Sequence, residues 1–98
     1  MTEADDQGKL LRWCASRGLF ARKLTCAGHR GWPDIFVGSP FTHQTLFIEM
    51  KAPNGVMSAH QKMTGNMLRK CGLNHVVCWS VEEAKLIIKS YCLAKDTA

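Results

Sequence analysis

Two acidic side chains and one lysine are the residues of this sequence whose types and spacing point to chemistry. Between Gln7 and Val81 the chain has ten Lys or Arg residues and only two acids, Asp34 and Glu49. Fourteen residues separate these two acids, and Lys51 follows Glu49 by two positions. A solvated surface seldom isolates two acids in a positive field, so we expect these carboxylates to have a function.

Two carboxylates beside an ammonium group are suited to metal-assisted chemistry on phosphate. Magnesium prefers oxygen ligands and is typically held by one or two carboxylates together with waters and substrate phosphate. A bound divalent ion activates water and neutralises the charge that grows on a scissile phosphate. Lys51 would orient the attacking water or help to deprotonate it, and would stabilise the pentacovalent charge.

The elements around these residues are predicted to be strands. Pro33 opens a strand over 34–38, and the segment 45–52 is the clearest strand of the chain. Side chains alternate along a strand, so Glu49 and Lys51 project from one face while Ile48 and Met50 project from the other. A hairpin between the two strands would bring Asp34 next to Glu49 at a sheet edge.

The remaining elements follow from caps, glycines and apolar periodicity. Acids after Thr2 favour a helix start and Gly18 ends that helix, while Ser58 caps a second helix that ends before Gly72. Ser80 or Val81 starts a third helix. The predicted ranges, in chain order, are a helix over 2–18, strands over 19–26, 34–38 and 45–52, a helix over 58–71, a strand over 75–80 and the last helix. The order α-β-β-β-α-β-α predicts one α/β domain over residues 1–98.

Composition excludes several classes of protein. The chain is 46% hydrophobic and 21% charged, and it has neither a charged-then-apolar leader nor an apolar run near the ~20 residues of a membrane span. These features favour a cytoplasmic protein without a membrane partner. The five cysteines form no C-x-x-C pair, so we expect no structural zinc and treat them as small buried hydrophobes. The loop A-G-H-R-G lacks the ending of a phosphate-binding P-loop, so no nucleotide cofactor is expected.

Charge points to a polyanionic partner. The formal net charge is +5 and the sequence pI is about 9.1, a balance that is typical of nucleic-acid-binding domains but also occurs in other small proteins. By itself, the E-x-K pattern of Glu49 and Lys51 is often only an ion pair on one strand face. The additional Pro33-Asp34 at a strand start, with no other acids nearby, favours the catalytic interpretation.

The same residues resemble a nuclease family. Pro33-Asp34, the 14-residue gap and Glu49-Met50-Lys51 resemble the PD-(D/E)xK nuclease motif. More narrowly, the chain resembles the virus-type replication-repair nuclease (VRR-NUC) domain. The segments that carry this resemblance are, in order, G-W-P-D-I-F-V, F-I-E-M-K-A-P-N-G, S-A-H-Q and C-G-L-N-H-V-V-C. The resemblance runs from the first helix to the last. It implies a restriction-endonuclease-like core in which helices flank a central mixed sheet.

The resemblance also implies roles for particular residues. Asp34 and Glu49 would bind Mg²⁺ or Mn²⁺ with the backbone carbonyl of Met50, and Lys51 would be the catalytic lysine. Gln61 would reach the site from the following helix and orient water or phosphate. Glu3 resembles the first-helix glutamate that completes the site, although an acid at this position also fits a simple interaction with the helix dipole.

Other polar residues are candidates for contacts with the nucleic-acid backbone. These are His29, Arg30, Arg22, Lys23, Lys62 and Arg69, and a solvated surface role is the alternative for each. The remaining histidines, His43, His60 and His75, lack the mutual spacing of a metal site and are expected to be structural or exposed. Trp32 would serve either in packing or as a wedge against DNA.

Three functions remain open at the level of sequence. The resemblance implies a stand-alone phage or bacterial endonuclease that acts as a homodimer and nicks branched DNA, such as four-way junctions. A module of the same fold could instead bind structured nucleic acid without cutting it, but such a module would have no reason to keep two acids facing a polyanion. The third possibility is a nuclease subunit that acts on flaps or on RNA.

Overall fold

The computed structural model describes residues 3–25 and 30–93, apart from the side chains of Glu3 and Ala4. The elements are α1 (Glu3–Ser16), β1 (Phe20–Lys23), β2 (Ile35–Gly38), β3 (Thr45–Met50), α2 (Ala59–Lys70), β4 (His75–Cys78) and α3 (Val81–Cys92). Their order is the order predicted from the sequence. Among the described residues, no helix has the length and apolar character that a membrane span requires.

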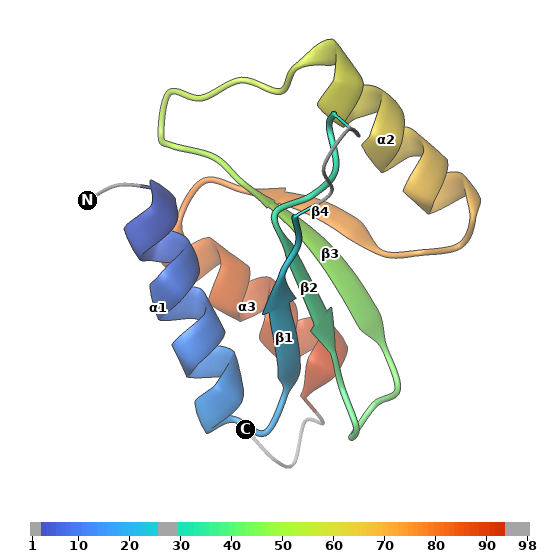
Figure 1. Cartoon of the computed structure of the whole chain (residues 1–98). Helices are drawn as coiled ribbons and strands as arrows, with labels where there is room; N and C mark the ends of the chain where they lie inside the picture. The colour runs from blue at the N-terminus through green and yellow to red at the C-terminus, as the bar shows by residue number, and fades with distance from the viewer. Residues whose placement is uncertain (1–2, 26–29, 94–98) are drawn as a thin grey trace.

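The four strands form one mixed sheet in the order β1-β2-β3-β4. β1 and β2 are antiparallel, β2 and β3 form the predicted antiparallel hairpin, and β4 lies parallel to β3. Helix α2 makes the crossover between the two parallel strands. Helices α1 and α3 lie on one side of the sheet and α2 lies on the other side (Figure 1). This is the central mixed sheet flanked by helices that the family resemblance implies.

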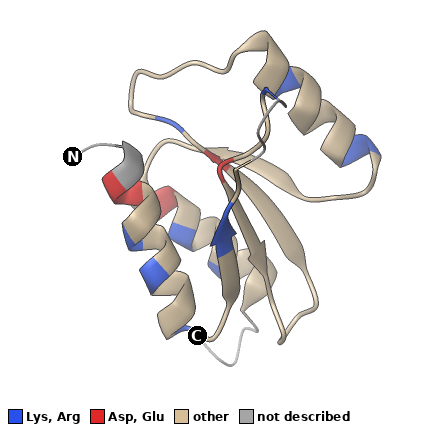
Figure 2. Cartoon of the chain, in the orientation of Figure 1, with Lys and Arg blue, Asp and Glu red and all other residues tan. Residues whose placement is uncertain are grey.

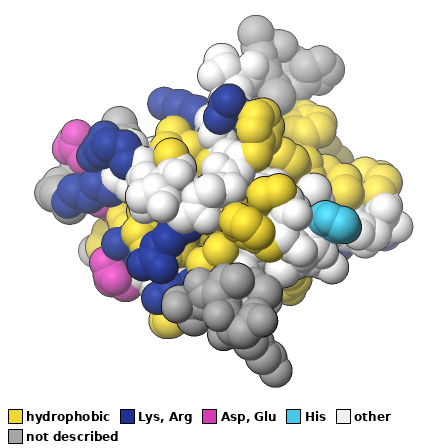
Figure 3. Space-filling view, turned by 90° about the horizontal axis from the view of Figure 1, so that it is seen from below, with side chains coloured by type: hydrophobic (Ala, Val, Ile, Leu, Met, Phe, Trp, Pro, Cys, Tyr) yellow, Lys and Arg dark blue, Asp and Glu magenta, His cyan; other side chains and the backbone are white. Residues whose placement is uncertain are grey.

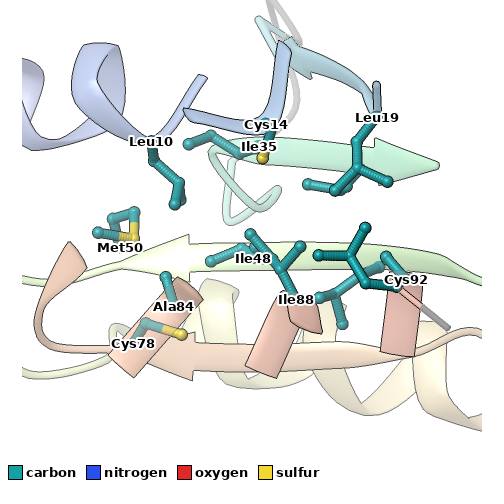
Figure 4. Close-up of a cluster of buried hydrophobic side chains, with 13 residues drawn as sticks. Leu10, Cys14, Leu19, Ile35, Ile48, Met50, Cys78, Ala84, Ile88 and Cys92 are labelled. Atoms are coloured by element: carbon teal, nitrogen blue, oxygen red, sulfur yellow. The ribbon is translucent and has the colours of Figure 1, made fainter. Parts of the chain in front are cut away.

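The core fills the space between the sheet and the α1–α3 layer. Ile35 and Val37 of β2, with Ile48 and Met50 of β3, project into it, and Leu10 of α1 meets them from the other side. Figure 4 shows these side chains from the helices and the strands pointing toward one another. The predicted alternation in β3 is therefore confirmed, because Ile48 and Met50 lie in the core.

The buried core consists of aliphatic and sulfur-containing side chains, and of the aromatic residues only Trp13 is among those packed against it in the described part of the chain. Phe20, Trp32, Phe41 and Trp79 are exposed, while Phe36 and Phe47 occupy the face of the sheet that does not meet α1 and α3. The molecule therefore presents aromatic surface that its own core does not need.

The cysteines follow the prediction at three positions and depart from it at one. Burial raises the pKa of the Cys14 and Cys78 thiols to about 12 and of Cys92 to about 11, so they stay neutral. Cys71 is exposed, because it is the C-cap residue of α2 and lies outside the core. Cys26 lies outside the described residues.

All four strands are shorter than predicted, and β2 lacks only the first expected residue because it begins at Ile35. β1 ends at Lys23 because β2 begins only at Ile35, and β3 ends at Met50 because a turn at 52–55 follows. β4 ends at Cys78, and the predicted strand residue Ser80 instead caps α3 by accepting a hydrogen bond from the Glu83 N–H at 3.0 Å. Each error lies at an element end, where local hydrogen bonds decide the boundary.

Helix α2 reaches the sheet at β4 through a close contact between a glycine and a histidine. A Cβ added to Gly65 would lie 2.6 Å from Cε1 of His75, so only glycine lets the helix approach this ring. Arg69 Nη1 lies 2.9 Å from His75 Nδ1, and a guanidinium can only donate, so this histidine accepts the hydrogen bond. Burial, and secondly the Arg69 charge, lower the pKa of His75. The expected structural role of His75 is the one observed.

Candidate functional site

The β2–β3 hairpin brings the two isolated acids together. Asp34 immediately precedes Ile35, whose partner across the ladder is Ile48, and Glu49 immediately follows Ile48. The Asp34 N–H donates to the Ile48 carbonyl at 3.0 Å, and Asp34 Oδ2 accepts a hydrogen bond from the Met50 N–H at 2.8 Å. The Asp34 carboxylate is thus anchored beside the Glu49–Met50 peptide, and only one of its oxygens is used for this anchor.

Glu49 occupies a buried position in the sheet. Its exposed fraction is 1%, and its cross-strand neighbour on β4 is Val77. A carboxylate in such a place keeps its charge only if groups around it compensate for the lost water. A strand position flanked on both sides fixes the carboxylate far more tightly than a surface loop would.

Lys51 directly follows Met50, the last residue of β3. Its N–H donates to the Cys78 carbonyl at 2.8 Å, which extends the hydrogen bonding between β3 and β4 by one residue, and its side chain is half-buried. Figure 2 shows acidic residues where β2 begins and β3 ends, with a basic residue on the chain that leaves β3. This end of the two inner strands therefore carries two acidic residues, with a lysine directly after the second of them.

The oxygen ligands available at this end of β2 and β3 fit a hard divalent cation. Two carboxylates and the backbone of Met50 supply oxygen only, which suits Mg²⁺ or Mn²⁺ better than a soft metal. In the described part of the chain, no group of three or more His, Cys, Asp or Glu residues is arranged to hold a metal ion. An ion here would hence take two carboxylates and complete its coordination with waters or phosphate oxygens, as Mg²⁺ commonly does.

Gln61 lies in the first turn of α2, where it has a capping role. Ser58 Oγ accepts a hydrogen bond from the Gln61 N–H at 3.1 Å, and Gln61 Oε1 accepts one from the Ser58 N–H at 2.9 Å. This capping box fixes the carboxamide at the start of the helix. The predicted role toward water or phosphate rests on the amide nitrogen of the side chain.

Gly31 allows this helix start to approach the chain that leads through Asp34 into β2. Its φ is +84°, and a Cβ added to it would lie 2.4 Å from the carbonyl group of His60 and 2.8 Å from the Gln61 nitrogen. Sequence reasoning missed this residue. The glycine of G-W-P-D was visible as a signal, but its need arises from a contact with residues 29 and 30 positions further along the chain.

The start of α1 lies near the chain that leaves the site. A hollow of about 560 Å³ is lined by Asp6 and Lys9 of α1, by Pro53 and by Trp79, Glu82 and Lys85. Pro53 follows Lys51 by two residues, so this hollow lies beside the chain that leaves β3 at the candidate site. Glu3 is the first residue of α1, and its side chain lies outside the described residues.

The predicted backbone contacts fall into two groups. Arg22, Lys23, Arg30 and Lys62 have exposed side chains, and His29 lies outside the described residues. Arg22 Nη1 donates to the carbonyl of the neighbouring Ala21 at 2.8 Å, whereas Arg69 differs because its guanidinium joins α2 to His75 of β4. In addition to the bond with His75, Arg69 Nη2 donates to Asn66 Oδ1 at 3.1 Å.

The fold and the site define a class of protein. A small α/β domain with paired acids and a following lysine at the end of a central strand has the architecture of PD-(D/E)xK nucleases. The profile of the VRR-NUC domain matches residues 15–82, which is more than half of the chain. The chain belongs to the VRR-NUC family.

Solved structures agree with this assignment. One, titled "VRR_NUC domain", superposes with a TM-score of 0.78 at 29% sequence identity, covering 91% of this chain and 96% of its own. Another, titled "VRR_NUC domain protein", has a TM-score of 0.77 at 23% identity, covering 93% of this chain and 88% of its own. No curated protein matched the sequence.

Membership of the family implies a nuclease-type domain whose substrate is DNA. The profile match begins after Glu3, so it carries no argument for that residue.

Proposed function

We propose that this chain is a metal-dependent, structure-selective DNA endonuclease that hydrolyses phosphodiester bonds. The observation that carries the proposal is the juxtaposition of Asp34, directly before β2, and Glu49 of the neighbouring β3, with Lys51 directly after β3. Two further facts are consistent with it: the chain belongs to a family of nuclease-type domains, and it has more basic than acidic residues.

In this mechanism the chain's own residues hold the metal and the water. Asp34, Glu49 and the Met50 carbonyl would bind one Mg²⁺ or Mn²⁺ ion, which when bound activates water and neutralises charge on the phosphate. The Lys51 ammonium orients the attacking water and stabilises the charge of the transition state. Gln61, held by its capping box, donates from its amide nitrogen to water or to a phosphate oxygen.

The substrate we propose is branched DNA, with four-way junctions as the leading case, and the acting form is a homodimer. A 98-residue domain offers little surface of its own for recognition, and two-fold symmetry would match two cuts on a symmetric junction. Aromatic residues outside the core are available for an interface or for DNA. Such an enzyme acts in the cytoplasm of a bacterial cell or of a phage-infected host.

Cleavage assays with matched lysine variants test the proposal. Labelled four-way junction, flap, duplex and single-stranded DNA are incubated with the protein in Mg²⁺, in Mn²⁺ or in EDTA. Lys51→Ala is compared with Lys89→Ala, which removes an exposed lysine of α3 on the other side of the sheet. We expect metal-dependent cleavage with a preference for branched DNA, at least about a hundredfold slower in Lys51→Ala and unchanged in Lys89→Ala.

Other outcomes would overturn the proposal or part of it. Tight binding without cleavage in any metal would make the chain a binding module of the same fold. Equal cleavage of all DNA structures would remove the structure selectivity, and preferred cleavage of RNA or flaps would change the substrate. A purely monomeric protein that still makes paired cuts would contradict the homodimer.

A further inference from the structure

Among the described residues, no helix lies over one half of the sheet on the face opposite the core. Helix α2 packs against β4, so β1 and β2 lie beyond its cover (Figure 1). Cross-strand pairing of Phe20 with Gly38 and of Arg22 with Phe36 places these four residues on this face. Ile35 and Val37 point the other way into the core. We call the surface formed by Phe20, Arg22, Phe36, Gly38 and Thr45 the open sheet face.

A continuous row of aromatic rings crosses this face toward the candidate active site. Ring centroids lie 6.4 Å apart for Phe20 and Phe36, 5.3 Å for Phe36 and Phe47, and 6.5 Å for Phe47 and Trp32. Phe36 is two residues from Asp34, and Phe47 is two residues from Glu49, a spacing of about 6.8 Å along a strand. The row therefore begins beside the paired acids and ends at Phe20 on the sheet edge.

The outer end of the row is exposed and carries a positive charge. Phe20 is 54% exposed, and the guanidinium carbon of Arg22 lies 4.2 Å from the centre of its ring. This end forms an open hollow of about 630 Å³, whose described lining residues include Arg22 and His43 but neither Asp nor Glu. In the view from below, exposed hydrophobic side chains lie beside a cluster of Lys and Arg side chains (Figure 3).

From these features we infer that the open sheet face binds an unpaired segment of nucleic acid next to the cleavage site. Bases stack on aromatic rings and on arginine planes only when they are not already paired and stacked in a duplex. Phosphates of the same strand would be attracted by the positive charge of the hollow, and no acid among its described lining residues would repel them. The inference rests on the proposed nuclease function and adds to it that the substrate carries unpaired nucleotides beside the scissile phosphate.

Binding measurements in EDTA test this surface separately from catalysis. The probes are an oligothymidine of about 12 nucleotides and a duplex of the same length. Phe20→Leu keeps apolar volume without a flat ring, and Arg22→Lys keeps the charge without a planar guanidinium. We expect each to weaken binding of the oligothymidine by roughly fivefold to a hundredfold, with little change for the duplex. Leu86→Ala and Lys89→Ala, at exposed positions of α3, are expected to bind like the parent protein.

The outcomes separate the inference from the proposed function. If Phe20→Leu and Arg22→Lys bind both probes as the parent does, or bind both more weakly by the same factor, the inference is wrong. Unchanged cleavage by the same variants would leave the nuclease proposal intact. If the two variants lose oligothymidine selectively while the parent cleaves nothing in Mg²⁺, the surface stands and the nuclease proposal fails. If Phe20→Leu instead converts a dimer to a monomer with unaltered oligothymidine binding, a second copy of the chain covers this face, and the inference is overturned.

Discussion

At the scale of single residues, the site depends on how firmly each group is held. Asp34 is anchored by its hydrogen bond to the Met50 N–H, and Glu49 is buried within the sheet. Both acids could be predicted from the sequence, because they stand alone among basic residues. Gly31 and Arg69 could not be assigned in that way, since their roles depend on contacts with residues that are distant in the chain or on another element.

The role of Gly31 leads to a prediction for stability. Gly31→Ala would force a residue with a side chain to adopt a φ of +84° and would press its Cβ into the backbone of α2. Gly72 is the matched control, because its φ is +83° and nothing lies within 4 Å of an added Cβ. We expect Gly72→Ala to cost about 1–2 kcal/mol of unfolding free energy and Gly31→Ala to cost about 1–3 kcal/mol more. Urea unfolding measures both, and equal losses would show that the contact with α2 is unimportant.

Gln61 has both a capping role and a proposed catalytic role, and two variants separate them. Gln61→Glu keeps an acceptor for the Ser58 N–H, so we expect stability within about 0.5 kcal/mol but slower cleavage, because the carboxylate repels phosphate and cannot donate. Ser58→Ala removes the cap and costs about 1 kcal/mol, while the folded protein keeps its cleavage rate. Thermal unfolding and single-turnover cleavage provide the two readouts. Undiminished cleavage by Gln61→Glu would limit this residue to capping.

At the scale of elements, the order of helices and strands could be predicted because each has its own local signal. Ser58 caps α2 and Ser80 caps α3, and apolar alternation marks β3. The ends of strands were less predictable. The end of β1 depends on where β2 begins, and the end of β4 depends on competition between the ladder and the cap of α3.

The approach of α2 to the sheet gives a prediction at this scale. Alanine normally stabilises a helix relative to glycine by about 0.5–1 kcal/mol. We expect that gain for Gly8→Ala in α1, where the nearest atom to an added Cβ is the flexible end of Arg12 at 3.3 Å. Gly65→Ala should instead lose about 1–3 kcal/mol, because its Cβ would overlap the ring of His75. Chemical denaturation compares them, and a gain in both would mean that α2 can move away from β4 at little cost.

At the scale of the whole molecule, the two faces of the sheet have different partners. One face is buried by α1 and α3, and the other is covered by α2 only near β4 (Figure 1). The sequence could not indicate this uncovered area, because strand order and helix placement decide which residues share a face. The paired acids and the aromatic row lie together only as a result of that arrangement.

The central claim is that the Asp34–Glu49 pair holds the ion that makes phosphodiester hydrolysis possible, and cleavage by Glu49→Gln tests it most directly. Glutamine has nearly the same size as glutamate, so the buried position remains filled while the charge is removed. A four-way junction is incubated with saturating protein over a series of Mg²⁺ concentrations, and circular dichroism confirms that the variant is folded. We predict cleavage by the parent that rises with Mg²⁺ and a rate in Glu49→Gln that is lower by at least about a hundredfold. A folded Glu49→Gln protein that cleaves at the parental rate would contradict the account.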